Sequence, residues 1–248
     1  MFFRTFAQQL DKNETNCFVC KTHVLVMKII LVGTSYPFRG GLASFNERLA
    51  RQFLSEGHEV EIVTFTVQYP AFLFPGKTQF SNENKPTDIR IVQKINSMNP
   101  FSWLSAAHYI RKQKADMVIF CYWMAFMSPA FGSIARCIHT KKTKLIALVH
   151  NMIPHEPTLL DSFLPPYFVH AMDGFVAMAK AVQSDIQQFE KSGKPIAVSP
   201  HPLYDHYGGK LDKSEASMKL GLHDKNNYVL FFGFIREYKG LDLLLEAF

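Results

Sequence analysis

The chain has 248 residues, enough for one large domain or two small ones with a buried core. Because 48% of the residues are hydrophobic and only 19% are charged, the composition excludes a disordered protein. Lys and Arg exceed Asp and Glu by 27 − 21 = 6. This moderate excess suits phosphorylated substrates or an anionic membrane surface, and it is too diffuse to indicate a nucleic-acid partner.

The amino-terminal segment carries no recognisable signal. Residues 1–26 lack the long apolar core and small-residue cleavage site of a signal peptide, so we interpret them as an extension, either a tail or an overcalled reading frame. Cys17 and Cys20 have C-x-x-C spacing but no second cysteine pair, and we assign them no metal or redox role. With four cysteines in the whole chain, a reducing cytoplasm is the default compartment.

The first β–loop–α unit begins at residue 27. Met27–Gly33 is a β-branched run that ends in Gly, which predicts a strand. A turn-rich loop follows, and a helix is predicted from near Leu42. Ser44 and Glu47 have the spacing of a capping box, and Gly57 stands where a carboxyl-terminal cap belongs.

Short apolar runs then alternate with helical patterns. Further strands are predicted at residues 58–65, 88–92, 116–122, 144–150, 174–179 and 195–199. Val182, Ile186 and Phe189 illustrate the helical spacing between two of them. This alternation predicts an α/β domain over residues 27–207, with a parallel sheet covered on both faces.

A second unit is predicted near the carboxyl terminus. Residues 212–227 are strongly polar, as in a linker, and Tyr228–Phe232 and residues 241–248 have strand and helix patterns. Because such a strand needs apolar neighbours on both faces, we interpret residues 208–248 as a linker and the truncated start of a second domain. The alternative is that Tyr228–Phe248 adds its strand to the first sheet.

Two loops combine features that favour an anion. Gly40 and Gly41 end a loop without the spacing of a dinucleotide or triphosphate loop, and they either expose helix N–H groups to an anion or merely permit a tight turn. Arg236 and Lys239 lie just before a predicted helix, where cations are unfavourable unless an anion such as a diphosphate bridges them. The alternative is a solvated loop with an Arg236–Glu237 contact.

The second loop and its helix carry a family resemblance. Residues 233–247 resemble the G-x-x-x-x-x-K-G-x-x-x-L-L-x-A segment that opens the second domain of glycosyltransferase family 4 enzymes. The Gly40-Gly41 loop, the Val149-His150-Asn151 strand end and the segment at residues 69–77 agree with the same family. The resemblance runs from Met27 to Phe248. It implies the GT-B fold: an N-terminal Rossmann-like domain, followed here by the first β–α unit of a second one.

The resemblance also implies roles for individual residues. Lys239 matches the lysine that holds the diphosphate of the nucleotide sugar, and Arg236 is assigned the same role although many members have their Arg at position 234. Gly40 and Gly41 match the backbone amides that face these phosphates. His150 matches a histidine that contacts the donor sugar, the alternative being a structural histidine. The two acidic residues of the family's E-x7-E motif would lie beyond residue 248, so we expect the chain as given to be incomplete, to bind a nucleotide sugar weakly and to be inactive in transfer.

Two further interpretations concern metals and the acceptor. His150, His155 and Glu156 lack zinc-site spacing because Pro154 interrupts a helix, so we expect no metal. The segment at residues 65–80 holds five aromatic rings beside a lysine. We name Tyr69, Phe74 and Lys77 as acceptor-side candidates, and ordinary core packing is the alternative.

The sequence therefore predicts a retaining glycosyltransferase of hexosyltransferase type that moves a sugar from a nucleotide diphosphate sugar to a hydroxyl acceptor, either a glycan or a lipid-linked glycan. The predicted catalytic residues are His150, Arg236 and Lys239. No cofactor and no nucleic-acid partner are expected. The predicted location is the cytoplasm, with peripheral contact at the inner membrane face. Alternatives are a nucleotide-sugar epimerase of the same architecture and a non-catalytic nucleotide-sugar binding fragment.

Overall fold

The computed structural model describes residues 26–70, 78–154, 160–202, 208–223, 225–233, 235–236 and 239–247. The chain divides into two compact units, Met1–His201 and Pro202–Phe248, which we call unit 1 and unit 2 and describe separately. The amino-terminal extension lies almost wholly outside the described residues.

Unit 1 contains a seven-stranded parallel sheet, which confirms the predicted α/β fold. Its strands are β1 (Lys28–Val32), β2 (Glu59–Val67), β3 (Arg90–Asn96), β4 (Met117–Tyr122), β5 (Lys144–Val149), β6 (Gly174–Ala177) and β7 (Ile196–Val198). They lie in the order β3-β2-β1-β4-β5-β6-β7. The chain therefore moves outward from β1 in one direction and from β4 in the other, and ligands of such sheets bind at the carboxyl ends of the strands where this reversal occurs.

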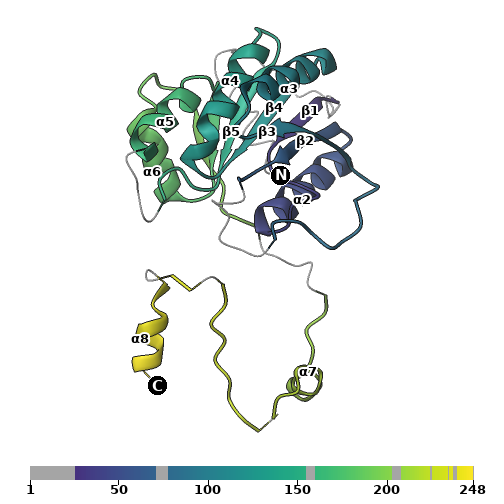
Figure 1. The fold of residues 1–248 in the computed structure, drawn as a ribbon, viewed down its shortest axis with the longest axis vertical. Coiled ribbons are helices and arrows are strands. Elements are labelled where there is room, and N and C mark those ends of the chain that lie inside the picture. Colours follow the sequence, from purple (N-terminus) through teal and green to yellow (C-terminus); the bar gives the residue numbers. More distant parts are fainter. Residues whose placement is uncertain are drawn as a thin grey trace, which may run out of the picture. The chain divides into compact units, whose positions relative to one another are not determined.

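Helices cover both faces of the sheet. The helical elements of unit 1 are α2 (Gly41–Ser55), α3 (Pro100–Gln113), η2 (Ala125–Met127), α4 (Ser128–Ile138), α5 (Leu160–Val169) and α6 (Lys180–Phe189). Figure 1 shows α3 and α4 on one side of the sheet and α2 on the other. Accordingly, Ile30 and Val32 of β1 belong to the core beneath α3 and α4, whereas Ile29 and Leu31 pack with α2. This alternation is the two-residue period of a strand buried on both faces.

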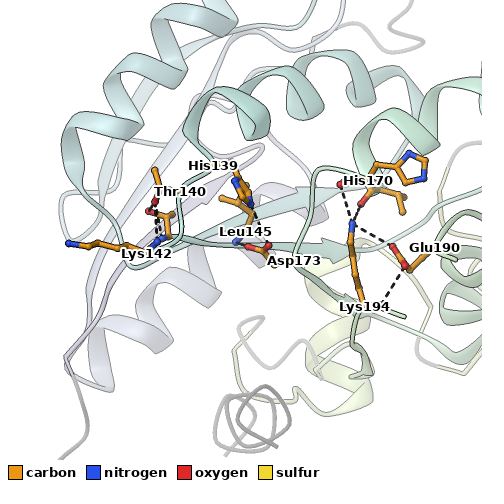
Figure 2. A network of polar contacts seen from close by, with 10 residues as sticks. His139, Thr140, Lys142, Leu145, His170, Asp173, Glu190 and Lys194 are labelled. Carbon is orange, nitrogen blue, oxygen red and sulfur yellow. Dashed lines mark hydrogen bonds and ion pairs between the residues drawn. The ribbon is translucent and has the colours of Figure 1, made fainter. Parts of the chain in front are cut away.

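Polar side chains hold the amino-terminal edge of the sheet together. The Asp173 carboxylate accepts a hydrogen bond of 2.8 Å from the backbone N–H of Leu145, where β5 begins. The Lys194 ammonium donates to the carbonyl of His170 at 3.1 Å and forms an ion pair with Glu190 at 3.6 Å (Figure 2). A lysine at the end of a helix satisfies its last carbonyls, so this network fixes the end of α5 against the sheet.

The described residues of unit 2 form two short helices, α7 (Lys213–Leu220) and α8 (Leu241–Glu246). The predicted helix near residue 241 is thus confirmed, whereas α7 lies inside the segment interpreted as a linker. Asp212 explains α7, because its carboxylate accepts from the backbone N–H of Glu215 at 2.9 Å and caps the helix.

The predicted strand at residues 228–232 pairs with no other described segment. A strand needs a neighbour to accept its backbone hydrogen bonds, and unit 2 offers none among the residues described. The seven strands of the first sheet all lie between Lys28 and Val198, and the assignment of residues 208–248 to a second domain stays a prediction. In the described part of the chain, no helix has both the length and the apolar character that crossing a bilayer demands.

A tightly packed glycine of unit 1, Gly33, generates a prediction. A Cβ atom on Gly33 would lie 2.8 Å from Cys121 Cβ and 3.1 Å from Asn46 Nδ2. We expect Gly33→Ala to lower the free energy of unfolding by about 1–3 kcal/mol, the usual cost of overpacking a core. Urea denaturation measures it, with Gly209→Ala as control because nothing lies within 4 Å of that site. Equal stability of the two variants would contradict the packing described here.

Candidate anion and sugar site

The candidate site lies at the carboxyl edge of the sheet, beside the reversal of strand order. The loop after β1 leads through Gly40 into α2, and β5 ends next to His150. Since β1 pairs with β4 and β4 pairs with β5, these two segments follow strands separated by only one other strand. The structure therefore brings the predicted glycine loop and the predicted histidine to one edge of unit 1.

Buried polar side chains hold the start of the glycine loop. The backbone N–H of Ser35 donates to Thr64 Oγ1 at 3.1 Å. The hydroxyl of Thr34 donates to Gln68 Oε1 at 2.6 Å, and Asn46 Nδ2 donates to the Thr34 carbonyl at 2.8 Å. All five side chains are buried. Because these groups satisfy one another away from water, they fix the loop in one conformation.

Glu47 adds a charged contact to the same loop. Its carboxylate accepts hydrogen bonds of 2.9 Å from the Ser35 hydroxyl and from the backbone N–H of Tyr36. The predicted capping box is therefore wrong: the N-cap is Gly40, Ser44 lies within the helix, and Glu47 binds the preceding loop. The predicted terminator is confirmed, because Gly57 has φ 89° just after the helix end.

The amino terminus of α2 exposes backbone donors. Gly40 has φ 120° and ψ 171°, a conformation that requires glycine, and no side chain caps the helix. The backbone N–H of Ser44 makes the first hydrogen bond of the helix, to the carbonyl of the N-cap residue Gly40 at 3.1 Å. Gly40 and Gly41 are both exposed. The 15-residue helix thus presents to solvent the positive end of its dipole and N–H groups that have no acceptor among the described residues, an arrangement that can bind an anion.

His150 lies at the end of β5 with a fixed backbone and a partly paired ring. Its N–H donates to the Tyr122 carbonyl at 2.8 Å, and its ring packs edge-on against Phe45 with centroids 4.8 Å apart. Its Nδ1 lies 3.4 Å from Nε2 of His201, while its own Nε2 is buried without a partner among the described residues. The interpretation as a structural histidine accounts for Nδ1 and leaves Nε2 unexplained.

The surroundings of His150 keep it neutral. Burial, followed by the nearby His201, lowers the pKa of His150 from its ordinary 6.5 to about 3. A neutral imidazole has one donor and one acceptor nitrogen, so it can hydrogen bond to a hydroxyl but cannot balance a negative charge.

Of the acceptor-side candidates, only Tyr69 lies among the described residues, and Phe74 and Lys77 lie outside them. The Tyr69 ring packs against the core, and its hydroxyl accepts from Trp123 Nε1 at 2.6 Å. Burial raises the pKa of Tyr69. These contacts agree with the core-packing alternative.

Unit 2 carries the two predicted cations. Arg236 and Lys239 are both exposed, and the Lys239 N–H donates to the Arg236 carbonyl at 3.0 Å. The ammonium of Lys239 lies against Gly233, where a Cβ atom would be 2.5 Å away from it. Neither side chain forms an ion pair with a carboxylate in the described ranges, and Glu237 lies outside them.

No three His, Cys, Asp or Glu side chains among the described residues are grouped as a metal site requires. His155 and Glu156 are outside that part of the chain. The absence of a metal cofactor therefore stays a prediction.

Comparison with known proteins supplies a family match. The model of Glycosyltransferase Family 4 matches residues 39–204, which is 166 of 248 residues. No curated protein matches the sequence. The chain spans half or less of the length of three solved structures that it matches.

Three solved structures illustrate these matches. A glycosyltransferase from Rickettsia africae ESF-5 is 17% identical, with a TM-score of 0.49 and coverage of 79% of this chain and 50% of that one. Acinetobacter baumannii MurG is 14% identical, with a TM-score of 0.42 and coverage of 68% and 44%. An alpha-glucosyltransferase in complex with UDP-glucose and DNA containing an abasic site is 13% identical, with a TM-score of 0.47 and coverage of 71% and 42%.

The last of these corrects one expectation. The exclusion of a nucleic-acid partner is wrong, because an alpha-glucosyltransferase among the matched structures is in complex with DNA. The argument rested on diffuse charge, and charge that is diffuse along a sequence does not report how basic residues gather on a surface.

The contact of Glu47 with the loop generates a prediction. We expect Glu47→Ala to lower the free energy of unfolding by about 1–3 kcal/mol, because the Ser35 hydroxyl and the Tyr36 N–H lose a charged acceptor. Urea denaturation measures the change. Glu56→Ala, at an exposed carboxylate that accepts from Gln52, is the matched control and should change stability by no more than about 0.5 kcal/mol. Equal effects would show that Glu47 does not hold the loop.

The lowered pKa of His150 generates a second prediction. Because unfolded histidine binds a proton below pH 6.5 and folded His150 does not until about pH 3, this residue makes stability fall as the pH decreases. Between pH 7.5 and 5, the wild type should lose up to about 2 kcal/mol more than His150→Gln. Chemical denaturation at both pH values measures this, with exposed His108→Gln as control. Equal losses in wild type and His150→Gln would contradict it.

Proposed function

This chain belongs to glycosyltransferase family 4, and on that premise we propose that it transfers a sugar, of hexose type, from a nucleotide diphosphate sugar to a hydroxyl acceptor with retention at the anomeric carbon. The observation that carries the proposal is the uncapped amino terminus of α2. Its exposed N–H groups follow a loop that buried polar contacts hold rigid, beside the reversal of strand order. Such a terminus suits a phosphate group.

The proposed chemistry centres on the departing diphosphate. Negative charge grows on its oxygens as the bond to the sugar breaks, and donors already in place stabilise that charge without reorganising. We assign this role to the backbone amides at Gly40 and Gly41 and to the side chains of Arg236 and Lys239. The guanidinium offers two parallel donors and the ammonium a point charge.

His150 is assigned to the sugar. Its neutral ring and unpartnered Nε2 suit a hydrogen bond to a sugar hydroxyl, whereas a charged histidine would suit a phosphate better. Such a bond would discriminate strongly between a sugar that has this hydroxyl and one that lacks it, because the second sugar would leave a buried polar atom unpaired.

The acceptor is proposed to be a glycan or a lipid-linked glycan, reached from the cytoplasm with peripheral contact at the membrane. Support comes from the net charge of +6, which favours an anionic surface. No step of the proposed reaction uses a metal. A nucleotide-sugar epimerase of the same architecture is the competing enzyme, and analysis of products with and without acceptor distinguishes the two.

The role of Lys239 is tested by substitution. We expect Lys239→Ala to weaken the binding of UDP and other nucleoside diphosphates at least ~10-fold, since a charged hydrogen bond contributes about 1.5–3 kcal/mol. Isothermal titration calorimetry on the 248-residue chain measures binding. Exposed Lys225→Ala is the matched control and should bind as the wild type does. Unchanged nucleotide binding in Lys239→Ala would refute the assignment.

A further inference from the structure

Two histidines that are 51 residues apart in sequence stand on one aromatic ring. The ring of Phe45, on α2, contacts His150 edge-on at 4.8 Å and His201 at 5.4 Å between centroids. The two imidazoles lie 5.1 Å apart at an angle of 33°. Phe45 is 8% exposed, so the cluster rests on the core of unit 1. This packing fixes the position of each ring. Which ring nitrogen donates and which accepts then depends on the tautomers of the two histidines.

We propose that His201 is a positioning residue, which holds His150 in the tautomer with its proton on Nδ1 and so leaves Nε2 as a bare acceptor. The assignment of that acceptor to a sugar hydroxyl rests on the proposed function. The tautomer itself rests only on the contacts within unit 1.

The distance between the rings requires one donor and one acceptor. Nδ1 of His150 and Nε2 of His201 are 3.4 Å apart, so one of the two carries the shared proton. Burial lowers the pKa of both residues, most strongly for His150. Both rings are therefore neutral near pH 7, and each has a single N–H to place.

The other ring nitrogens decide which residue donates. If His201 donated, His150 would keep its proton on Nε2, which is buried and has no partner in the part of the chain that the structure describes. Orphaned N–H groups in protein interiors are rarer than unsatisfied acceptors, so this arrangement is the less favourable one. If His150 donates instead, the proton of His201 moves to its Nδ1, and because His201 is exposed this N–H can bond to water.

In many proteins, a neighbouring residue that hydrogen bonds to one ring nitrogen of a functional histidine fixes the tautomer of that histidine. The hydrogen bond at one ring nitrogen determines the state of the other. Here the backbone of His150 is fixed by its bond to Tyr122, and His201 is the last residue of unit 1. The ring of His150 is thus held by groups from α2, from the sheet and from the segment that leads to unit 2.

Long-range ¹H–¹⁵N NMR correlation spectra of the 248-residue chain test the proposal, because they report which imidazole nitrogen is protonated. The His150 signals are assigned from their loss in His150→Gln. Two variants form a matched pair: His201→Leu keeps apolar packing on Phe45 but removes the acceptor, and His201→Gln restores an acceptor oxygen. Exposed His108→Leu is the control, and thermal unfolding checks that each variant is folded.

We expect His150 to carry its proton on Nδ1 in the wild type, in His201→Gln and in His108→Leu, and to lose that state in His201→Leu. A proton on Nε2 in the wild type, or an unchanged tautomer in His201→Leu, would overturn the proposal. The measurement needs no ligand. Failure to bind a nucleotide sugar would therefore count against the proposed function alone, and a wrong tautomer would count against the positioning role alone.

Discussion

The contact between Gly33 and Cys121 is the constraint on which the site depends. It brings the ends of β1 and β4 together at the reversal of strand order, with no room for a side chain on residue 33. The same approach places Asn46 beside Gly33, within reach of the Thr34 carbonyl. Farther along the loop, the Phe38 N–H donates to the Ser35 carbonyl and the Arg39 N–H to the Gln79 carbonyl, each at 3.0 Å. Packing inside the sheet thus sets the geometry of the exposed amides at the start of α2. Because the interior is close-packed, that geometry has little freedom to change.

This dependence means that the proposed anion site is built in advance of any ligand. A loop that became ordered only on binding would lose conformational entropy at that moment, and its donors would stabilise a developing charge less. The contacts of Ser35, Thr64 and Gln68 remove that cost when the protein folds. Asn46 Oδ1 is an exception, a buried acceptor without a partner among the described residues, and it shows that the network is not fully satisfied.

Sequence patterns predicted the part of the fold that depends on local periodicity. The seven strands, the parallel sheet and the glycine that ends α2 all follow from apolar spacing and backbone preference, which each segment carries by itself. The role of Glu47 could not be predicted, because a capping box and a contact to the preceding loop have the same spacing and differ only in where the helix begins. His201 was missed for a related reason: its partner is distant in sequence, and no spacing rule joins them. The capping pattern of Asp212 and Glu215 was a signal for α7 that the polar composition concealed.

The backbone bond between His150 and Tyr122 has a consequence for how this protein can change. It extends the pairing of β5 with β4 by one residue, so the Cα of His150 is placed by the sheet and not by a loop. Exchange of the imidazole for another side chain would leave the main chain where it is. Substitutions at this position would therefore change the proposed sugar contact while the architecture persists, so a new ligand preference could arise there in a single mutational step.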